Sequence, residues 1–129
     1  LERFVEVVAH GPFERAWERI ASAPIALVPR SRSGGAPIKL VNALAAGQAV
    51  LADRRATPHL EHGESAWLVE MDDPDAVADG LERLIADGPL RRRLSRGARE
   101  AAERHHSLEG MLRRLERVYA AAVSGVRAS

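Results

Sequence analysis

The chain contains no cysteine, one lysine and few aromatic residues, and it has no long apolar run. Without cysteine it can form neither a disulfide framework nor a thiolate-based catalytic or zinc site, which fits a reducing compartment. No apolar stretch approaches the roughly 20 residues of a membrane-spanning helix, and the start does not resemble a signal peptide. We therefore expect a cytoplasmic protein without a transmembrane segment.

The composition that remains is that of a soluble globular protein. The 129 residues are 46% hydrophobic and 29% charged, with a formal net charge of +1. This balance gives no overall case for a nucleic-acid or membrane partner. The length fits one domain, near the small end for an enzyme with two substrates. Because the first residue is Leu1, we expect the chain to be the tail of a longer protein.

Strand and helix patterns alternate along the first part of the chain. Short apolar runs at 4–10, 24–29, 49–52 and 66–71 predict strands, and segments 13–23, 37–46 and 73–86 predict helices. We expect a Rossmann-like α/β fold, with a parallel sheet flanked by helices on both faces over 1–88. Two further helices follow over 89–123, and residues 1–129 form a single domain.

Helical spacing also predicts which side chains point inward. In the 37–46 helix these are Ile38, Val41, Leu44 and Ala45, and in the 73–86 helix they are Val77, Leu81, Leu84 and Ile85. Asp73 and Pro74 are typical of an N-cap and a first helical position.

The stretch SGGAPIKLVNALAAGQAV, residues 33–50, connects a predicted strand to a predicted helix at the carboxyl end of that strand. Ligands bind at this position in open parallel sheets. Gly34 and Gly35 let a ligand approach the backbone, Pro37 suits the start of a helix, and free N–H groups at that start favour an anion. The loop indicates a phosphate site, although an ordinary strand-to-helix turn would have the same composition.

Lys39 is the only lysine beside 18 arginines, and it lies in the first turn of that helix. An exposed ammonium there opposes the helix dipole at a cost of about 0.3–1 kcal/mol unless an anion neutralises it. Lys39 is therefore a candidate ligand for the phosphate, and a solvated surface lysine is the alternative.

From ALVPRSRS to ERLIAD the sequence resembles the C-terminal, nucleotide-sugar-binding domain of group 1 retaining glycosyltransferases with the GT-B fold. The resemblance covers about residues 4–123 and depends on the order of five sequence features. They are a strand end, a loop, a helix with Asn-Ala-Leu-Ala-Ala-Gly, an acidic-Gly loop before Trp-Leu-Val, and a helix that starts with Asp-Pro. It implies a hexosyl-type transfer from a nucleotide-diphosphate sugar, with no resident cofactor and no metal. It also implies that the later helices pack on the sheet and that the last one crosses back onto the N-terminal acceptor-binding domain.

The resemblance assigns donor-binding roles to particular residues. Backbone at Gly35, Ala36, Pro37 and Ile38 corresponds to the segment that approaches the sugar and phosphates, beside Lys39. Two family glutamates correspond to Gly34 and Asn42. The first contacts the donor sugar and phosphate region, and the second binds ribose hydroxyls, to which the Asn42 amide would bind more weakly than a carboxylate.

The N-terminal acceptor domain of such enzymes and the basic pair that binds the pyrophosphate have no counterpart in this chain. We therefore expect the chain to be inactive in isolation, with catalytic residues unassigned. The alternative is a non-catalytic nucleotide-binding or interaction module of the same ancestry. The acceptor is open and includes sugars, lipid-linked acceptors and envelope glycans.

Other polar clusters have simpler explanations than a second site. Asp73 and Asp75 fit a helix start, and the run from His59 to Glu64 matches no compact metal motif. His105 and His106 fit the end of a helix. The arginine-rich segment 91–100 favours a solvated face and leaves a membrane-peripheral location open.

Overall fold

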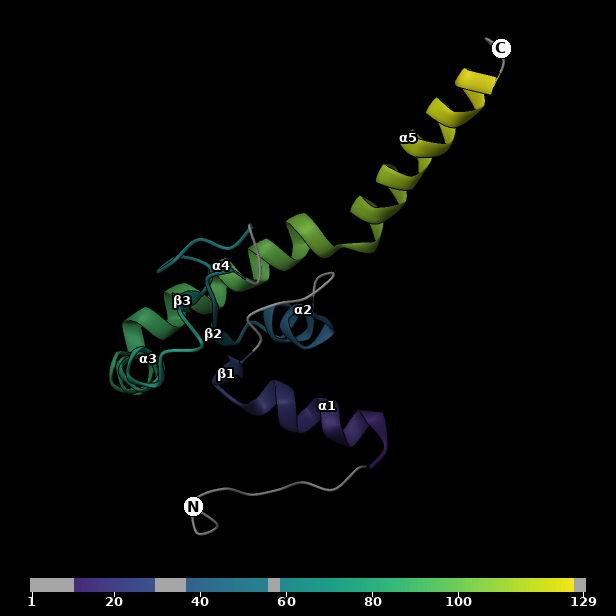
Figure 1. Ribbon diagram of the computed structural model, residues 1–129. Helices are drawn as coiled ribbons and strands as arrows, with labels where there is room; N and C mark the ends of the chain where they lie inside the picture. Colours follow the sequence, from purple (N-terminus) through teal and green to yellow (C-terminus); the bar gives the residue numbers. More distant parts are fainter. Residues whose placement is uncertain (1–10, 30–36, 56–58, 127–129) are drawn as a thin grey trace.

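A computed structural model describes residues 11–29, 37–55 and 59–126. It contains a three-stranded parallel sheet with strand order β1-β2-β3, flanked by helices (Figure 1). This arrangement confirms the predicted α/β class, whereas the predicted strand at 4–10 lies outside the described residues. The elements in chain order are α1 (Phe13–Ser22), β1 (Ile25–Val28), α2 (Ile38–Ala45), β2 (Ala49–Asp53), β3 (Trp67–Val69), α3 (Pro74–Ala86), α4 (Gly88–His106) and α5 (Leu108–Val126).

The central strand β2 is buried along its whole length, because it pairs with β1 on one side and β3 on the other. Its residues alternate between the two faces of the sheet. Val50 and Ala52 join one apolar cluster, while Ala49 and Leu51 join the other. A continuous apolar strand is what a parallel sheet covered on both faces requires.

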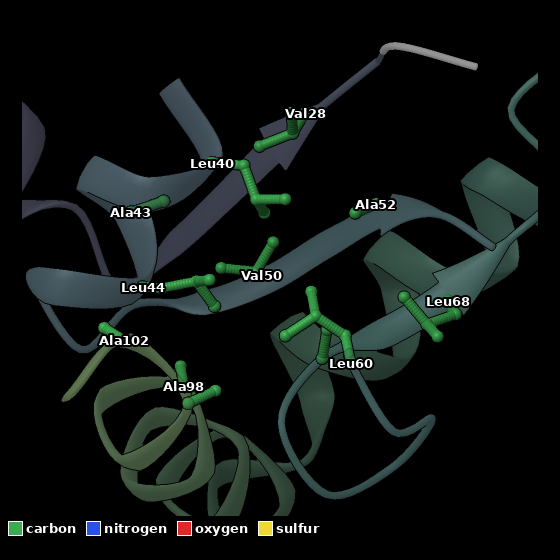
Figure 2. Packing of buried hydrophobic residues seen from close by; sticks show 12 residues of the cluster. Val28, Leu40, Ala43, Leu44, Val50, Ala52, Leu60, Leu68, Ala98 and Ala102 are labelled. Atoms are coloured by element: carbon green, nitrogen blue, oxygen red, sulfur yellow. The ribbon is translucent and has the colours of Figure 1, made fainter. Parts of the chain in front are cut away.

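The first cluster packs α2 and the second half of α4 against the sheet (Figure 2). The second cluster packs α3 and the first half of α4 against the opposite face. Helix α4 thus contributes Leu90 and Leu94 to one core and Ala98 and Ala102 to the other. It lies very close to the backbone before β3, because a Cβ on Gly97 would lie 2.2 Å from the Glu64 carbonyl oxygen.

The helices begin and end within three residues of the predicted bounds. Asp73 caps α3 by accepting hydrogen bonds from the N–H groups of Asp75 and Ala76, at 3.0 and 3.1 Å. Asp87 caps α4 by accepting from the Leu90 N–H at 2.8 Å. Gly47, with φ of +68°, follows the end of α2 in a left-handed conformation that favours glycine.

Several predicted inward positions are wrong. In α2, Ile38 is 77% exposed and Ala45 is also exposed, whereas Leu40, Ala43 and Leu44 form the buried side. In α3, Ile85 is 67% exposed, while Leu84 is fully buried. The helical period fixes the spacing of the apolar residues along a helix. Which of them are buried depends on where the sheet and the neighbouring helices cover that helix.

The two later helices take different paths. Helix α4 packs on the sheet as expected, and the last helix, α5, extends away from the sheet beyond the end of α4 (Figure 1). Seven large apolar side chains of α5 are between 43% and 68% exposed. They are Leu108, Met111, Leu112, Leu115, Val118, Tyr119 and Val123.

Candidate functional site

The carboxyl edge of the sheet brings together the ends of three strands. The register places Val28 of β1 beside Ala52 of β2, and Asp53 of β2 beside Val69 of β3. Helix α2 begins after β1, and polar residues follow β2 and β3 directly. This edge is where ligands bind in open parallel sheets, so the described residues around it form the candidate site.

In the part of the chain that the structure describes, helix α2 starts with no compensating negative charge. Its N-cap is the buried Pro37, whose carbonyl oxygen accepts from the N–H groups of Leu40 and Val41 at 2.9 and 3.1 Å. The N–H groups of Ile38 and Lys39, in the first turn, have no acceptor within an α-helix. Among the described residues, no side chain caps this end, and no acidic residue lies in its first turn. The start of α2 therefore carries an uncompensated partial positive charge.

The predicted binding residues that the structure describes are gathered in this helix. Ile38 and Lys39 are exposed in its first turn, and Asn42 lies half-buried one turn further on. Lys39 forms no ion pair with any residue of the described segments. Gly34, Gly35 and Ala36 lie outside the described residues. The described part of the predicted site thus consists of Pro37, Ile38, Lys39 and Asn42.

A buried carboxylate closes the end of β2. The Asp53 side chain is fully shielded from solvent, and it accepts hydrogen bonds through both oxygens. Oδ1 accepts from the main-chain N–H and Nε of Arg55, at 2.7 and 3.0 Å. Oδ2 accepts from a terminal guanidinium nitrogen of Arg55 at 3.0 Å and from the Met71 N–H at 3.1 Å. The carboxylate therefore holds the residues after β2 against those after β3.

The charges in this network reinforce each other. The side-chain hydrogen bonds from Arg55 lower the pKa of Asp53 from 3.8 to about 2, against the opposing effect of burial, and main-chain hydrogen bonds add to the lowering. The hydrogen bonds to Asp53 likewise raise the pKa of Arg55. Arg55 also lies 3.2 Å from Asp72 and 3.5 Å from Glu70. It therefore remains charged and links three acidic side chains along the carboxyl edge.

Sequence reasoning missed the pair of Asp53 and Arg55. The available signal was an aspartate at the last position of a continuous apolar strand, followed by two arginines. A buried charge in such a position requires a partner, and Arg55 lies within reach two residues later. Asp53 and Arg55 hold the edge of the sheet together, and the guanidinium of Arg55 donates its hydrogen bonds to the carboxylate of Asp53.

Three histidines lie where the second half of α4 meets the loop before β3. The rings of His59 and His105 stack with centroids 4.9 Å apart. Burial lowers the pKa of His106, and the nearby positive charges of His105, His59 and Arg114 lower it further. His105 and His106 lie in the last turn of α4, as predicted.

The described residues contain no group of three or more metal-ligating side chains. In the run from His59 to Glu64, Nδ1 of His62 accepts a hydrogen bond from the Leu68 N–H at 3.0 Å. Asp73 is engaged as a helix cap. Within the same segments, no helix is long and apolar enough to cross a membrane.

Comparison with known proteins gives consistent matches. The family model described as "Glycosyl transferases group 1" matches residues 2–87. An exopolysaccharide phosphotransferase of Streptomyces coelicolor is 31% identical over 97 residues. That match covers 73% of this chain but 10% of the relative, so the chain spans about a tenth of that protein's length.

Two solved structures share the fold. The C-terminal domain of a glycosyl transferase group 1 family protein from Francisella tularensis superposes with a TM-score of 0.65 at 23% identity, over 81% of this chain and 53% of that one. Sucrose-phosphate synthase from Thermosynechococcus elongatus superposes with a TM-score of 0.74 at 21% identity, over 83% of this chain and 27% of that one. The sheet and its helices therefore have the architecture of those proteins.

Proposed function

The chain belongs to the group 1 glycosyl transferases, and we propose that it is the donor side of such an enzyme, where a nucleotide-diphosphate sugar binds. The substrate is a diphosphate carried at the start of α2 and on the loop that leads into it. The enzyme transfers the sugar to an acceptor held by a part of the protein that this chain does not contain. The lack of cysteine is compatible with a cytoplasmic location.

The observation that supports this proposal most is the open start of α2. Its free N–H groups and helix dipole attract an anion, and no acidic residue of its first turn competes for them. Lys39 adds a full positive charge in the same turn without an ion-pair partner in the described residues. A phosphate group would satisfy both features.

The proposed ribose contact comes from Asn42. Its side chain is half-buried one turn beyond Ile38, and no residue of the described segments is hydrogen-bonded to its amide group. The amide oxygen would accept from a ribose hydroxyl, but without the charge of the family glutamate. We therefore expect modest affinity for the nucleotide.

Sugar transfer breaks the bond between the sugar and the diphosphate, so negative charge develops on the leaving phosphate. That charge is stabilised by positive groups and N–H donors held in place beforehand. The proposed site supplies Lys39 and the start of α2 without any metal ion. It supplies no acceptor site, so we expect the 129-residue chain to bind the donor nucleotide without catalysing transfer.

Calorimetric titration of the chain with UDP, GDP and ADP tests the proposal. We expect one nucleotide to bind more tightly than the others, and Lys39→Gln to weaken binding about fivefold. Arg92→Gln on the exposed side of α4 removes the same charge and is the matched control. Failure of all three nucleotides to bind, or equal affinity of Lys39→Gln and the unchanged chain, would overturn the proposal. Sugar transfer by the isolated chain would overturn its catalytic part.

The second candidate is a non-catalytic nucleotide-binding or interaction module. It is favoured by Gly34 and Asn42, which stand where the family has glutamates. The variant Asn42→Glu tests the ribose contact, since a carboxylate at the ribose should tighten nucleotide binding several-fold. Unchanged affinity would remove the ribose assignment.

A further inference from the structure

Helices α4 and α5 meet at a junction that gathers positive charge. Ser107 alone separates the two helices, and α5 leaves the domain beyond the end of α4 (Figure 1). The end of α4 and the adjoining part of α5 line a hollow of about 650 Å³. Its charged lining is four arginines and one glutamate, with a net charge of +3: Arg104, Arg113, Arg114, Arg117 and Glu116.

Small residues of α5 leave room between the guanidinium groups. Gly110 and Ala120 line the same hollow, each three residues from the nearest of the arginines along the helix. Residues at spacings of three and four share one side of a helix, so a compact ligand can approach the helix surface there. Leu112 and Leu115 lie around the other side of α5, so the hollow is separate from the exposed apolar face.

Little negative charge in the described segments balances these arginines. Arg113 forms an ion pair within α5. Arg114 donates a hydrogen bond to the main-chain carbonyl oxygen of His105 at 3.2 Å, which holds its guanidinium across the junction between the helices. Arg104 and Arg117 form no ion pair with any described residue. At least two of the four guanidinium groups are therefore available to an anion.

The positive charge at the junction also acts on a neighbouring imidazole. Burial lowers the pKa of His106, and the positive charges of His105, His59 and Arg114 lower it further. An anion beside Arg114 would offset part of this effect and raise the pKa of His106, because a nearby negative charge favours the protonated imidazole. His106 is therefore a built-in reporter of the charge in the hollow.

We propose that this hollow binds a ligand that carries two linked phosphate groups, at a site separate from the one at α2. Guanidinium groups bind phosphate oxygens through paired hydrogen bonds. Linked phosphates present several negative charges over a short distance, which suits guanidinium groups that converge from two helices. A single carboxylate would neutralise only one of them. The proposal does not depend on nucleotide binding at α2.

Titration of the 129-residue chain with inorganic pyrophosphate, followed by NMR of the main-chain amides, tests the proposal. At constant ionic strength, the signals of Gly110, Arg114 and Ala120 should shift and saturate. They should do so equally in Lys39→Gln, which weakens only the proposed site at α2. The absence of these shifts, or shifts confined to the start of α2, would overturn the proposal.

A pair of double variants separates the hollow from net charge. Arg104→Gln with Arg117→Gln should weaken pyrophosphate binding at least about tenfold. Arg92→Gln with Arg96→Gln removes the same charge from the exposed side of α4 and should leave binding unchanged. All four side chains are exposed, so the melting temperature should stay the same and confirm the fold. Equal weakening in the two double variants would overturn the proposal.

The imidazole of His106 gives an independent readout. Pyrophosphate should raise its pKa, measured by NMR of the ring signals, relative to sodium chloride at the same ionic strength. The pKa should not change in Arg104→Gln with Arg117→Gln at a concentration that saturates the unchanged chain alone. An unchanged pKa in the saturated unchanged chain would overturn the proposal.

Geranyl diphosphate distinguishes the sources of the diphosphate group, and either result supports the proposal. Affinity equal to that of pyrophosphate assigns recognition to the phosphates alone. Affinity at least about fivefold higher, lost with Arg104→Gln and Arg117→Gln, assigns the site to a lipid-linked diphosphate.

Discussion

The buried carboxylate at the end of β2 gives the sharpest test of the structure. In Asp53→Asn the side chain keeps its shape, but one carboxylate oxygen becomes an NH₂ group. Each of the two oxygens accepts from two donors, so either orientation of the amide sets NH₂ against donors. The substitution also removes the negative charge opposite Arg55.

The expected loss of stability is about 3 kcal/mol. The lowering of the Asp53 pKa from 3.8 to about 2 accounts for about 2 kcal/mol at most, because solvent screens the half-exposed Arg55. The unmatched donors add about 1 kcal/mol. Urea unfolding followed by circular dichroism at pH 7 measures this difference, and the melting temperature should fall by roughly 10 °C.

The loss should also depend on pH. Because folding lowers the pKa of Asp53, the carboxylate stabilises the fold above about pH 4, and this contribution declines as the pH falls toward 2. The stability difference between the unchanged chain and Asp53→Asn should shrink by about 1 kcal/mol from pH 5 to pH 3. Asp72→Asn is the control, since this exposed residue lies 3.2 Å from the same guanidinium and should cost less than about 0.5 kcal/mol. A constant difference across this range, or equal losses in the two variants, would refute the reasoning.

Three further substitutions test the packing. Gly97→Ala should cost about 2–3 kcal/mol in urea unfolding, because its Cβ would lie 2.2 Å from a backbone oxygen, whereas Gly88→Ala meets only arginine side chains at 3.5 and 3.7 Å and should be nearly neutral. Asp73→Ala removes the cap of α3 and should cost about 1 kcal/mol, and a loss below the error of the measurement would contradict the capping role. Gln48→Met removes two hydrogen bonds to the end of α1, at 2.6 and 2.9 Å, and should speed hydrogen exchange in α1 but not in α3.

The sequence predicts the described elements to within a few residues because local chemistry marks their ends. Asp73 and Pro74 set the start of α3, and Gly47 follows the end of α2. The apolar runs between these markers have strand length, so the alternation of strands and helices, and with it the α/β class, can be predicted without a template.

The candidate site is harder to predict, because it depends on residues that approach each other through the fold. The start of α2 follows from local sequence, but the link between Asp53 and Met71 exists only once β2 and β3 are paired. The exposed positions at Ile38 and Ile85 were predicted to be buried because a helical period says nothing of where the covering layer ends. For α5, the amphipathic pattern is present, but no described residue covers its large apolar side chains.

Helix α4 runs from one face of the sheet to the other, and this path has a consequence for how the molecule loses its structure. Local unfolding that detaches α4 removes side chains from both apolar clusters at once. Neither cluster can therefore unfold while the other stays intact. A polypeptide cut off ahead of residue 88 would retain its three strands but lack the segment that fastens the two sides together. Protease trimming at that point should therefore yield a collapsed, loosely ordered fragment instead of a smaller folded unit.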